Sequence, residues 1–190
     1  METLERSIYS IPNLLSLMRL ALVPVLIGLA YIGDANAFLG VLVVSLLSDV
    51  LDGYLARKLN QVSELGAKLD SWGDMLTYGS MILGLYWIWP EVFKAQAAYL
   101  LATMIFFIAP LVMALRKFGE YPSYHTWGAK AAAVLMAPAY YMLVLWDADG
   151  FFRAVILLHV LVACEEIAIT LILDRPRSNV RSVFNLRTSI

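Results

Sequence analysis

Hydrophobic residues are concentrated in six runs along the chain, separated by polar and turn-forming residues. The runs lie at residues 15–33, 36–56, 69–89, 95–115, 128–146 and 151–173. Each is close to the ~20 residues that an α-helix needs to cross a bilayer. Gly, Pro, Asp and Asn mark the breaks, and no alternating strand pattern appears. The pattern predicts an all-α, polytopic membrane protein with six transmembrane helices.

The segment before the first run is predicted to be a short interfacial helix over residues 1–12. Apolar residues recur there at helical spacing, at Ile8, Ile11 and Leu14. A signal peptide is the alternative, because residues 20–33 followed by Ala-Asn-Ala at 35–37 imitate an apolar core with a cleavage site. We favour a membrane helix, because the preceding segment is not plainly basic and the run approaches a full span.

Composition supports a single integral-membrane domain over residues 1–190. Hydrophobic residues make up 61% of the chain and charged residues only 15%, whereas soluble domains are roughly 45–50% apolar. The net charge of −1 gives no reason to expect a nucleic-acid partner. Cys164 is the only cysteine, so an intramolecular disulfide is excluded.

Lysine and arginine are distributed unevenly between the two ends of the predicted helices. One side has only Lys94 and Arg153. The other side carries Arg6, Arg57, Lys58, Lys68, Arg116, Lys117, Lys130, Arg175, Arg177, Arg181 and Arg187. By the positive-inside rule, the basic side faces the cytoplasm. Both termini and the loops at 57–68 and 116–127 are therefore expected on the cytoplasmic face of a cytoplasmic membrane.

Four aspartates lie near the cytoplasmic ends of two neighbouring runs, at Asp49, Asp52, Asp70 and Asp74. An ionised carboxylate inside a membrane helix costs on the order of 3 kcal/mol, so four of them require a compensating cation or water. Their separations of three and four residues place each pair on one face of a helix. If the two faces meet, they form an all-oxygen cage suited to Mg²⁺, Mn²⁺ or Ca²⁺, with room for more than one ion.

Small residues and an arginine accompany the aspartates. Gly53, Ala56 and Gly66 would let a neighbouring backbone or a bulky phosphate approach closely. Arg57 lies more than one turn beyond Asp52 and can face a phosphate with its planar set of donors. The cage, the small surfaces and the arginine together indicate phosphoryl chemistry.

Structural interpretations of the same residues remain open. The aspartates could form an ion-pair cluster with Arg57, Lys58 or Lys68, although one cation for several anions is a poor balance. Arg57 could be an interface residue whose charged end reaches water. The small residues could serve helix packing alone, because packing and substrate approach demand the same residue types.

The spacing of these residues resembles a known signature. Residues 49–74 read Asp-x2-Asp-Gly-x2-Ala-Arg-x8-Gly-x3-Asp-x3-Asp, which is similar at every fixed position to the signature of the CDP-alcohol phosphatidyltransferases. Residues 11–19, Ile-Pro-Asn-Leu-Leu-Ser-Leu-Met-Arg, also resemble the entry to the first membrane helix of that family. The six-span layout agrees with the family fold, and the resemblance implies a homodimer.

The resemblance implies metal-dependent transfer of a phosphatidyl group from CDP-diacylglycerol to a small polar alcohol, with release of CMP, in phospholipid biosynthesis. Two divalent cations, Mg²⁺ or Mn²⁺, are then held by Asp49, Asp52, Asp70 and Asp74. Ca²⁺ would be an inhibitory or crystallographic occupant. Asp74 has the added role of general base. The CDP moiety and its phosphates are expected to contact Asp52, Gly53, Ala56, Arg57, Gly66 and Asp70.

Candidates for the acceptor side lie in the second half of the chain. They are Arg116, His125 and Lys130 around the loop before the fifth run, and Glu165 and Glu166 in the sixth. Positive-inside topology alone also explains the basic residues. Acids within a membrane helix are functional candidates by default. The two glutamates could bind the acceptor, shape a polar cavity or pair with a buried arginine such as Arg19.

The acceptor alcohol is left open by the sequence. Glycerol 3-phosphate is the first candidate, because the basic residues attract phosphate, and serine and inositol phosphate are others. Members of the family that make phosphatidylglycerophosphate or cardiolipin usually follow the third aspartate with Pro-x-Ala and the fourth with Lys. This chain has Ser-Trp-Gly at 71–73 and Met75 instead.

Two other classes of membrane protein are weighed against the transferase. A cation-coupled transporter would also use intramembrane carboxylates, but such sites tend to lie near the midplane between repeated halves, and no repeat is evident. A membrane prenyltransferase would also bind a pyrophosphate through metal-bound aspartates. Its donor would lack the nucleotide, so release of CMP distinguishes the two enzymes.

Overall fold

The structure is a computed structural model that describes residues 10–120, 124, 126–177, 180 and 182–183. The described residues form no strands and six helices, which are α2 (Ile11–Ile32), α3 (Ala35–Lys58), α4 (Glu64–Ile88), α5 (Pro90–Phe118), α6 (Trp127–Trp146) and α7 (Asp149–Ile172). The predicted all-α class and its six long helices are confirmed. The interfacial helix predicted over residues 1–12 falls mostly outside the described residues, and Ile11 and Pro12 already belong to α2.

Five of the six helices are long and apolar enough to cross a membrane, as expected of a multi-pass membrane protein. They are α2, α3, α5, α6 and α7. Helix α4 is not among the five, and its first half carries Lys68, Asp70 and Asp74. The six predicted helices are therefore confirmed, and five of them are long and apolar enough to cross a membrane.

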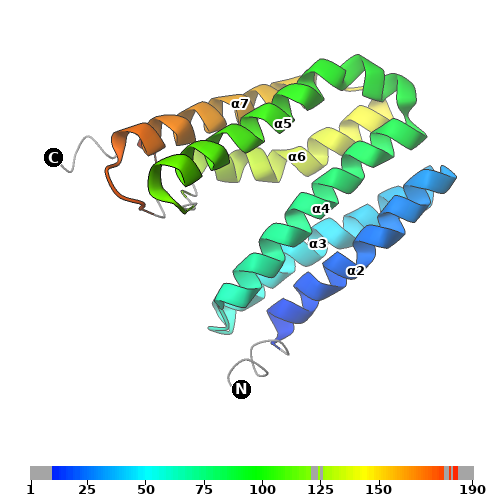
Figure 1. Ribbon diagram of the computed structural model, residues 1–190. Helices are drawn as coiled ribbons and strands as arrows, with labels where there is room; N and C mark the ends of the chain where they lie inside the picture. Colours follow the sequence, from blue (N-terminus) through cyan, green and yellow to red (C-terminus); the bar gives the residue numbers. More distant parts are fainter. Residues whose placement is uncertain (1–9, 121–123, 125, 178–179, 181, 184–190) are drawn as a thin grey trace. The chain divides into compact units, whose positions relative to one another are not determined.

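The chain divides into two compact units, and the first extends to Lys94. In this unit α2 packs along both α3 and α4 (Figure 1). Gly33 ends α2 in the left-handed region at φ 78°, where glycine is favoured, and Asp34 then caps α3 by accepting a hydrogen bond from the Ala37 amide. Ser63 caps α4 by accepting from the Gly66 amide. The short turn between α3 and α4 brings together the two helix ends that carry the aspartates.

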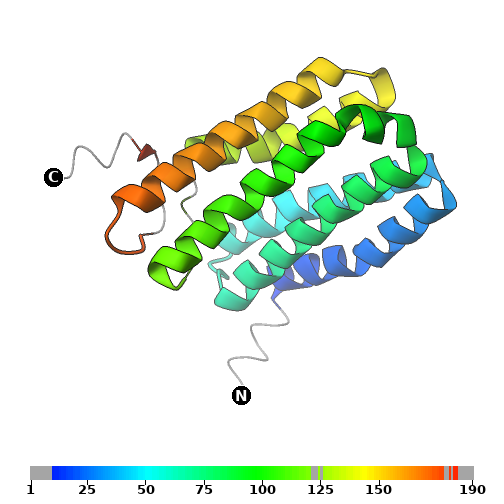
Figure 2. The same cartoon turned by 45° about the horizontal axis from the view of Figure 1, so that its top comes forward.

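The second unit contains most of α5 together with α6 and α7. Helices α6 and α7 pack against each other in an antiparallel pair (Figure 2). Beyond α7, Val180 packs with Tyr124 and Ile169 in a small buried cluster. The Tyr124 hydroxyl hydrogen-bonds to Thr170 at 2.7 Å, and burial raises the pKa of this tyrosine. Each unit thus has its own buried contacts.

Candidate functional site

The aspartate pairs lie on adjacent helices, Asp49 and Asp52 on α3 and Asp70 and Asp74 on α4. Carboxylate oxygens of Asp49, Asp70 and Asp74 all lie within 4.8 Å of one another. These three side chains are partly exposed, at 36%, 47% and 44%. The structure therefore brings one aspartate of α3 together with both aspartates of α4, on a surface that a ligand can reach.

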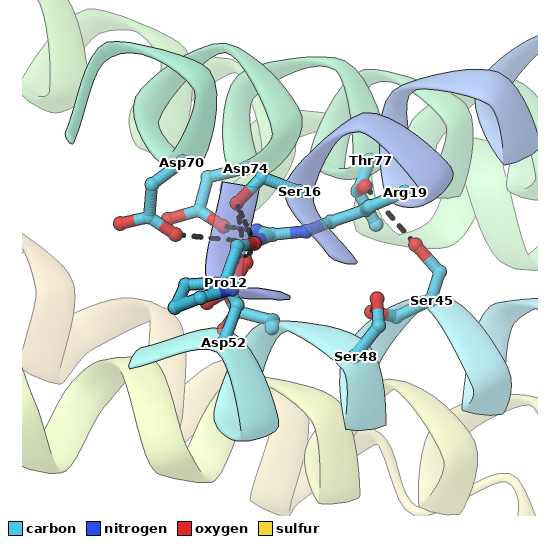
Figure 3. Close-up of polar contacts among 10 residues, drawn as sticks. Pro12, Ser16, Arg19, Ser45, Ser48, Asp52, Asp70, Asp74 and Thr77 are labelled. Atoms are coloured by element: carbon cyan, nitrogen blue, oxygen red, sulfur yellow. Dashed lines mark hydrogen bonds and ion pairs between the residues drawn. The ribbon is translucent and has the colours of Figure 1, made fainter. Parts of the chain in front are cut away.

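Arg19 of α2 supplies the positive charge at this site. Its side chain is 1% exposed. Nη1 lies 2.5 Å from Asp49 and 2.7 Å from Asp74, while Nη2 lies 2.5 Å from Asp52 and 3.1 Å from Asp70. Figure 3 shows the guanidinium reaching between Asp52 on one side and Asp70 and Asp74 on the other. One buried cation thus contacts all four aspartates.

Asp52 differs from the other three aspartates in its surroundings. Its side chain is only 2% exposed, and it is not one of the three that lie within 4.8 Å of one another. It accepts hydrogen bonds from the Ser16 hydroxyl at 2.7 Å and from Arg19. Both donors come from α2, so Asp52 joins α2 to α3 as well as contributing charge to the site.

The glycines of the signature have different neighbours. A Cβ atom built on Gly66 would lie 2.6 Å from Oδ1 of the buried Asn13 and would clash with α2. A Cβ atom on Gly53 would meet only the Arg57 guanidinium, at 3.5 Å. The packing of α4 against α2 therefore requires a glycine at position 66. At position 53, a Cβ atom would not clash with a neighbouring helix.

Arg57 and Ala56 lie on the last turns of α3, and Arg57 is exposed. Among the described residues, no ion pair joins the four aspartates to Arg57, Lys58 or Lys68. The cation that contacts the aspartates is Arg19 instead. The interpretation that Arg57 pairs with the aspartates therefore finds no ion pair among the described residues, and its contact with a phosphate stays a prediction.

The donor set fits a divalent cation. Four carboxylates facing one guanidinium leave three negative charges uncompensated when all are ionised, and ionised groups at this spacing repel one another strongly. Carboxylate oxygens from two rigid helices are the ligands that Mg²⁺ and Mn²⁺ prefer. Asp49, Asp70 and Asp74 are the residues placed to hold a cation.

The acceptor-side candidates belong to the second unit, except that His125 lies outside the described residues. Arg116 lies in the last turn of α5, which continues to Phe118, so this residue is helical and not part of the predicted loop. Basic residues favour that position because they interact with the C-terminal end of the helix dipole. Lys130, on α6, lies over the Trp127 ring at 5.4 Å.

The two glutamates of α7 have different partners. Glu165 accepts hydrogen bonds from the Ser182 hydroxyl at 2.7 Å and from the Val183 amide at 3.1 Å, so it holds the segment beyond α7. Glu166 lines a cavity of ≈ 230 Å³ together with Thr103 and His159. Arg19, one of the partners considered for this pair, contacts the aspartates instead, and the roles of the two glutamates stay predictions.

Sequence reasoning missed the role of Arg19 and did not use Ser16. Arg19 was considered as a partner for the glutamates, whereas it contacts the aspartates. A signal was present, because an arginine in the middle of an apolar run needs an anionic partner. The signature holds four anions, which makes it the strongest available partner. What sequence could not give is that α2 packs between the two aspartate-bearing helices.

Comparison with known proteins bears on this geometry. The family described as CDP-alcohol phosphatidyltransferase matches residues 9–172, which include Arg19, all four aspartates and most of both units. The chain belongs to the CDP-alcohol phosphatidyltransferase family. Members of this family are transferases, so the transporter alternative is not supported. No solved structure matches the chain.

Several curated members of the family are similar to this chain. A cardiolipin synthase (CMP-forming) of Streptomyces coelicolor is 35% identical over 151 residues, covering 76% of this chain and 69% of the relative. The rat cardiolipin synthase (CMP-forming) is 42% identical over 78 residues, which cover 40% of this chain and only 26% of the rat protein. A CDP-diacylglycerol–glycerol-3-phosphate 3-phosphatidyltransferase of Rickettsia bellii is 40% identical over 79 residues, 40% of this chain and 44% of the relative.

Proposed function

We propose that this protein transfers a phosphatidyl group from CDP-diacylglycerol to the hydroxyl of an alcohol, with release of CMP, in phospholipid biosynthesis. The observation that carries the proposal is the convergence of the partly exposed Asp49, Asp70 and Asp74, whose carboxylate oxygens lie within 4.8 Å of one another. Family membership supports the same reaction class. The fold supplies carboxylates for cations, open space at a glycine and a free arginine for the donor's phosphates.

The proposed reaction is a direct displacement at phosphorus. The acceptor hydroxyl oxygen attacks the β-phosphorus of CDP-diacylglycerol in line with the bond to the CMP oxygen, that bond breaks, and CMP leaves. Asp74 takes the proton of the attacking hydroxyl. Arg57 and the glycine surface at Gly53 bind and orient the pyrophosphate. Asp52, which is buried against α2, holds α3 in place and contributes charge.

We propose that Asp49, Asp52, Asp70 and Asp74 hold two Mg²⁺ or Mn²⁺ ions. When bound, such ions neutralise the pyrophosphate and stabilise the charge that develops on the transferred phosphoryl group. Asp74 contacts Nη1 of Arg19 at 2.7 Å through Oδ1, and a carboxylate has further lone pairs with which to accept a proton. This contact places a positive charge beside the proposed base.

We propose a glycerol-bearing acceptor, either glycerol 3-phosphate or phosphatidylglycerol. The relatives named above include two cardiolipin synthases and a transferase named for glycerol 3-phosphate. The cavity of α5, α6 and α7 is lined mostly by apolar side chains, and Thr103, His159 and Glu166 give it hydrogen-bonding groups that suit hydroxyl groups. Glu166 is therefore a better acceptor-side candidate than Glu165, and Arg116 and Lys130 remain candidates for a phosphate.

We further propose that the protein lies in the cytoplasmic membrane with both termini and the aspartates facing the cytoplasm. The asymmetry of lysine and arginine supports this orientation. The match over residues 9–172 extends across both compact units, which supports one functional domain. A homodimer is proposed on the resemblance of the chain to the family.

The test is CMP release from CDP-diacylglycerol by the purified full chain with Mg²⁺ or Mn²⁺. The acceptor panel comprises glycerol 3-phosphate, phosphatidylglycerol, serine, inositol and inositol phosphate. Asp70→Asn should abolish CMP release. Asp34→Asn is the matched control and should preserve CMP release, because asparagine can replace aspartate as the cap of α3. Release that requires one glycerol-bearing acceptor supports the proposal. An active Asp70→Asn protein, or release from CDP-diacylglycerol with no acceptor dependence, would contradict it.

A further inference from the structure

Arg19 contacts all four aspartates, yet it is not part of the signature that contains them. The four contacts are divided between two nitrogen atoms, with Nη1 facing Asp49 and Asp74 and Nη2 facing Asp52 and Asp70. A guanidinium usually makes bidentate contact with one carboxylate. Here it is shared by two pairs of carboxylates from two helices, which is how a central cation is coordinated.

Arg19 contacts the same carboxylates that a metal ion would need. Oδ1 of Asp49, of Asp70 and of Asp74 each lie within 3.1 Å of the guanidinium, and the same three aspartates form the candidate metal site. A divalent cation and a guanidinium repel each other at such short range. A metal ion bound by either oxygen of these carboxylates would lie close to the guanidinium, so Arg19 and the ion compete for the same negative charge.

The remaining contacts of Arg19 also show that it is not locked in a closed structural network. Its Nε is buried without a hydrogen-bond partner, so one donor of the side chain is unused in this arrangement. Gly73 gives the side chain its space, because a Cβ atom there would lie 3.2 Å from both Cδ and Nε of Arg19. The polar contacts of the side chain among the described residues are therefore those of its two terminal nitrogens with the aspartates.

We propose that Arg19 is the resident counter-cation of the aspartate cage. It offsets part of the negative charge of the four carboxylates and competes with divalent cations for the same groups. It is a positioning residue that holds the aspartates of α3 and α4 around one charge. The inference rests on the proposed function in that the competing ions are those of the transferase.

If Arg19 competes with metal ions, its removal should change metal affinity in a direction that a purely structural role of Arg19 does not predict. An arginine that merely supports the fold would, when removed, loosen the cage and weaken metal binding. A competing counter-cation would, when removed, lower the stability of the metal-free protein but strengthen metal binding, because the ions no longer displace a positive charge. The two effects have opposite signs for metal affinity.

The experiment measures Mn²⁺ binding and thermal unfolding of the full chain in detergent, without donor or acceptor. For Arg19→Gln we expect a Kd for Mn²⁺ at least tenfold lower than that of the unaltered protein. We also expect a lower Tm without metal and a larger rise of Tm when Mn²⁺ is added. Arg153→Gln is the matched control, because Arg153 is ion-paired with Asp149 and contacts none of the four aspartates. Its Mn²⁺ affinity should not change.

Weaker or unchanged Mn²⁺ binding by Arg19→Gln would overturn the proposal. If that variant cannot be purified, Arg19→Met carries the comparison, because it also removes the positive charge. Its Kd for Mn²⁺ should fall below that of the unaltered protein, and a Kd that rises or stays equal would overturn the proposal equally. Neither readout involves CMP release, so a failed transferase assay and a failed counter-cation test remain distinguishable.

Discussion

The two units of this chain treat their charged groups differently. In the first unit, four aspartates face one buried guanidinium, and three of the aspartates are partly exposed. In the second unit, the buried Gln96 connects Asp149 and Arg153 in a network where each group has a partner, since its amide donates to Asp149 and its carbonyl accepts from Arg153. The aspartate site of the first unit holds excess charge, and the Gln96 network of the second holds matched charge.

The difference separates a site for ligands from a structural network. Excess negative charge that is held rigidly on two helices favours an external cation, whereas a matched network needs nothing from outside. Family membership agrees with the functional interpretation of the first unit. Glu166 is the exception in the second unit, because it lines a cavity and its side chain has no partner among the described contacts. It is therefore the place in that unit where we expect a ligand.

The sharpest test of the comparison separates two aspartates within the first unit. We expect Asp74→Asn to lower the rate of CMP release by roughly a thousandfold or more, because the variant lacks the proposed general base. Nucleotide binding should be largely retained. Asp52→Asn should weaken CMP binding more, because Asp52 is buried against Ser16 and Arg19 and its loss disturbs the packing of α2. The measurements are CMP release and equilibrium CMP binding. Equal loss of CMP binding in both variants would refute this division of roles.

Much of the fold was predictable from the sequence because hydrophobic run length is a strong constraint in membranes. The six runs correspond to six helices, and the turn at residues 59–63 and the pairing of aspartates on helix faces follow from local spacing. The helices extend past several of the runs, because caps such as Ser63 and basic residues in last turns continue a helix beyond its apolar part. Helix α4 begins at Glu64, five residues before the run.

The rest could not be read from the sequence because it depends on which helices pack together. The contact of Arg19 with the aspartates requires α2 to lie along both α3 and α4, a tertiary fact with no local pattern. The bonds from Ser182 and Val183 to Glu165 also join separate segments. Gly66 illustrates the same limit, because spacing places it in the signature but only packing against Asn13 shows its steric role.

A pair of glycines on α4 tests whether the first unit depends on the close approach of α2. Gly66→Ala should lower stability by about 1–3 kcal/mol, because its Cβ would lie 2.6 Å from Asn13 Oδ1 and overpacking costs about that much. Gly79→Ala, on the same helix, meets nothing within 4 Å and should be neutral or stabilising, by up to about 1 kcal/mol from helix propensity. Thermal unfolding in detergent checks both. Equal Tm values for the two variants would contradict the packing role of Gly66.

The network of the second unit should be necessary for stability and irrelevant to metal binding. Gln96 is fully buried, and Gln96→Leu would leave hydrogen-bonding groups of Asp149 and Arg153 unpaired, at a cost of about 1–3 kcal/mol. Its Kd for Mn²⁺ should equal that of the unaltered protein. Gln61→Leu, at an exposed turn position, is the control and should change neither property. A changed Mn²⁺ affinity in Gln96→Leu would erase the functional contrast between the units.

The smallest expected effect compares two lysines that end in different environments. The Lys117 amine donates to the carbonyls of Thr170 and Leu171, which lie in the last turn of α7 and lack helical partners. Removing this contact in Lys117→Met should lower stability by about 1 kcal/mol. Lys94→Met removes an exposed ion pair with Glu91, worth about 0–1 kcal/mol, and should give the smaller shift of Tm. A larger shift of Tm for Lys94→Met would mean that burial of the partner does not determine how much a charged contact stabilises this protein. The distinction between excess and matched charge would then lose its physical basis.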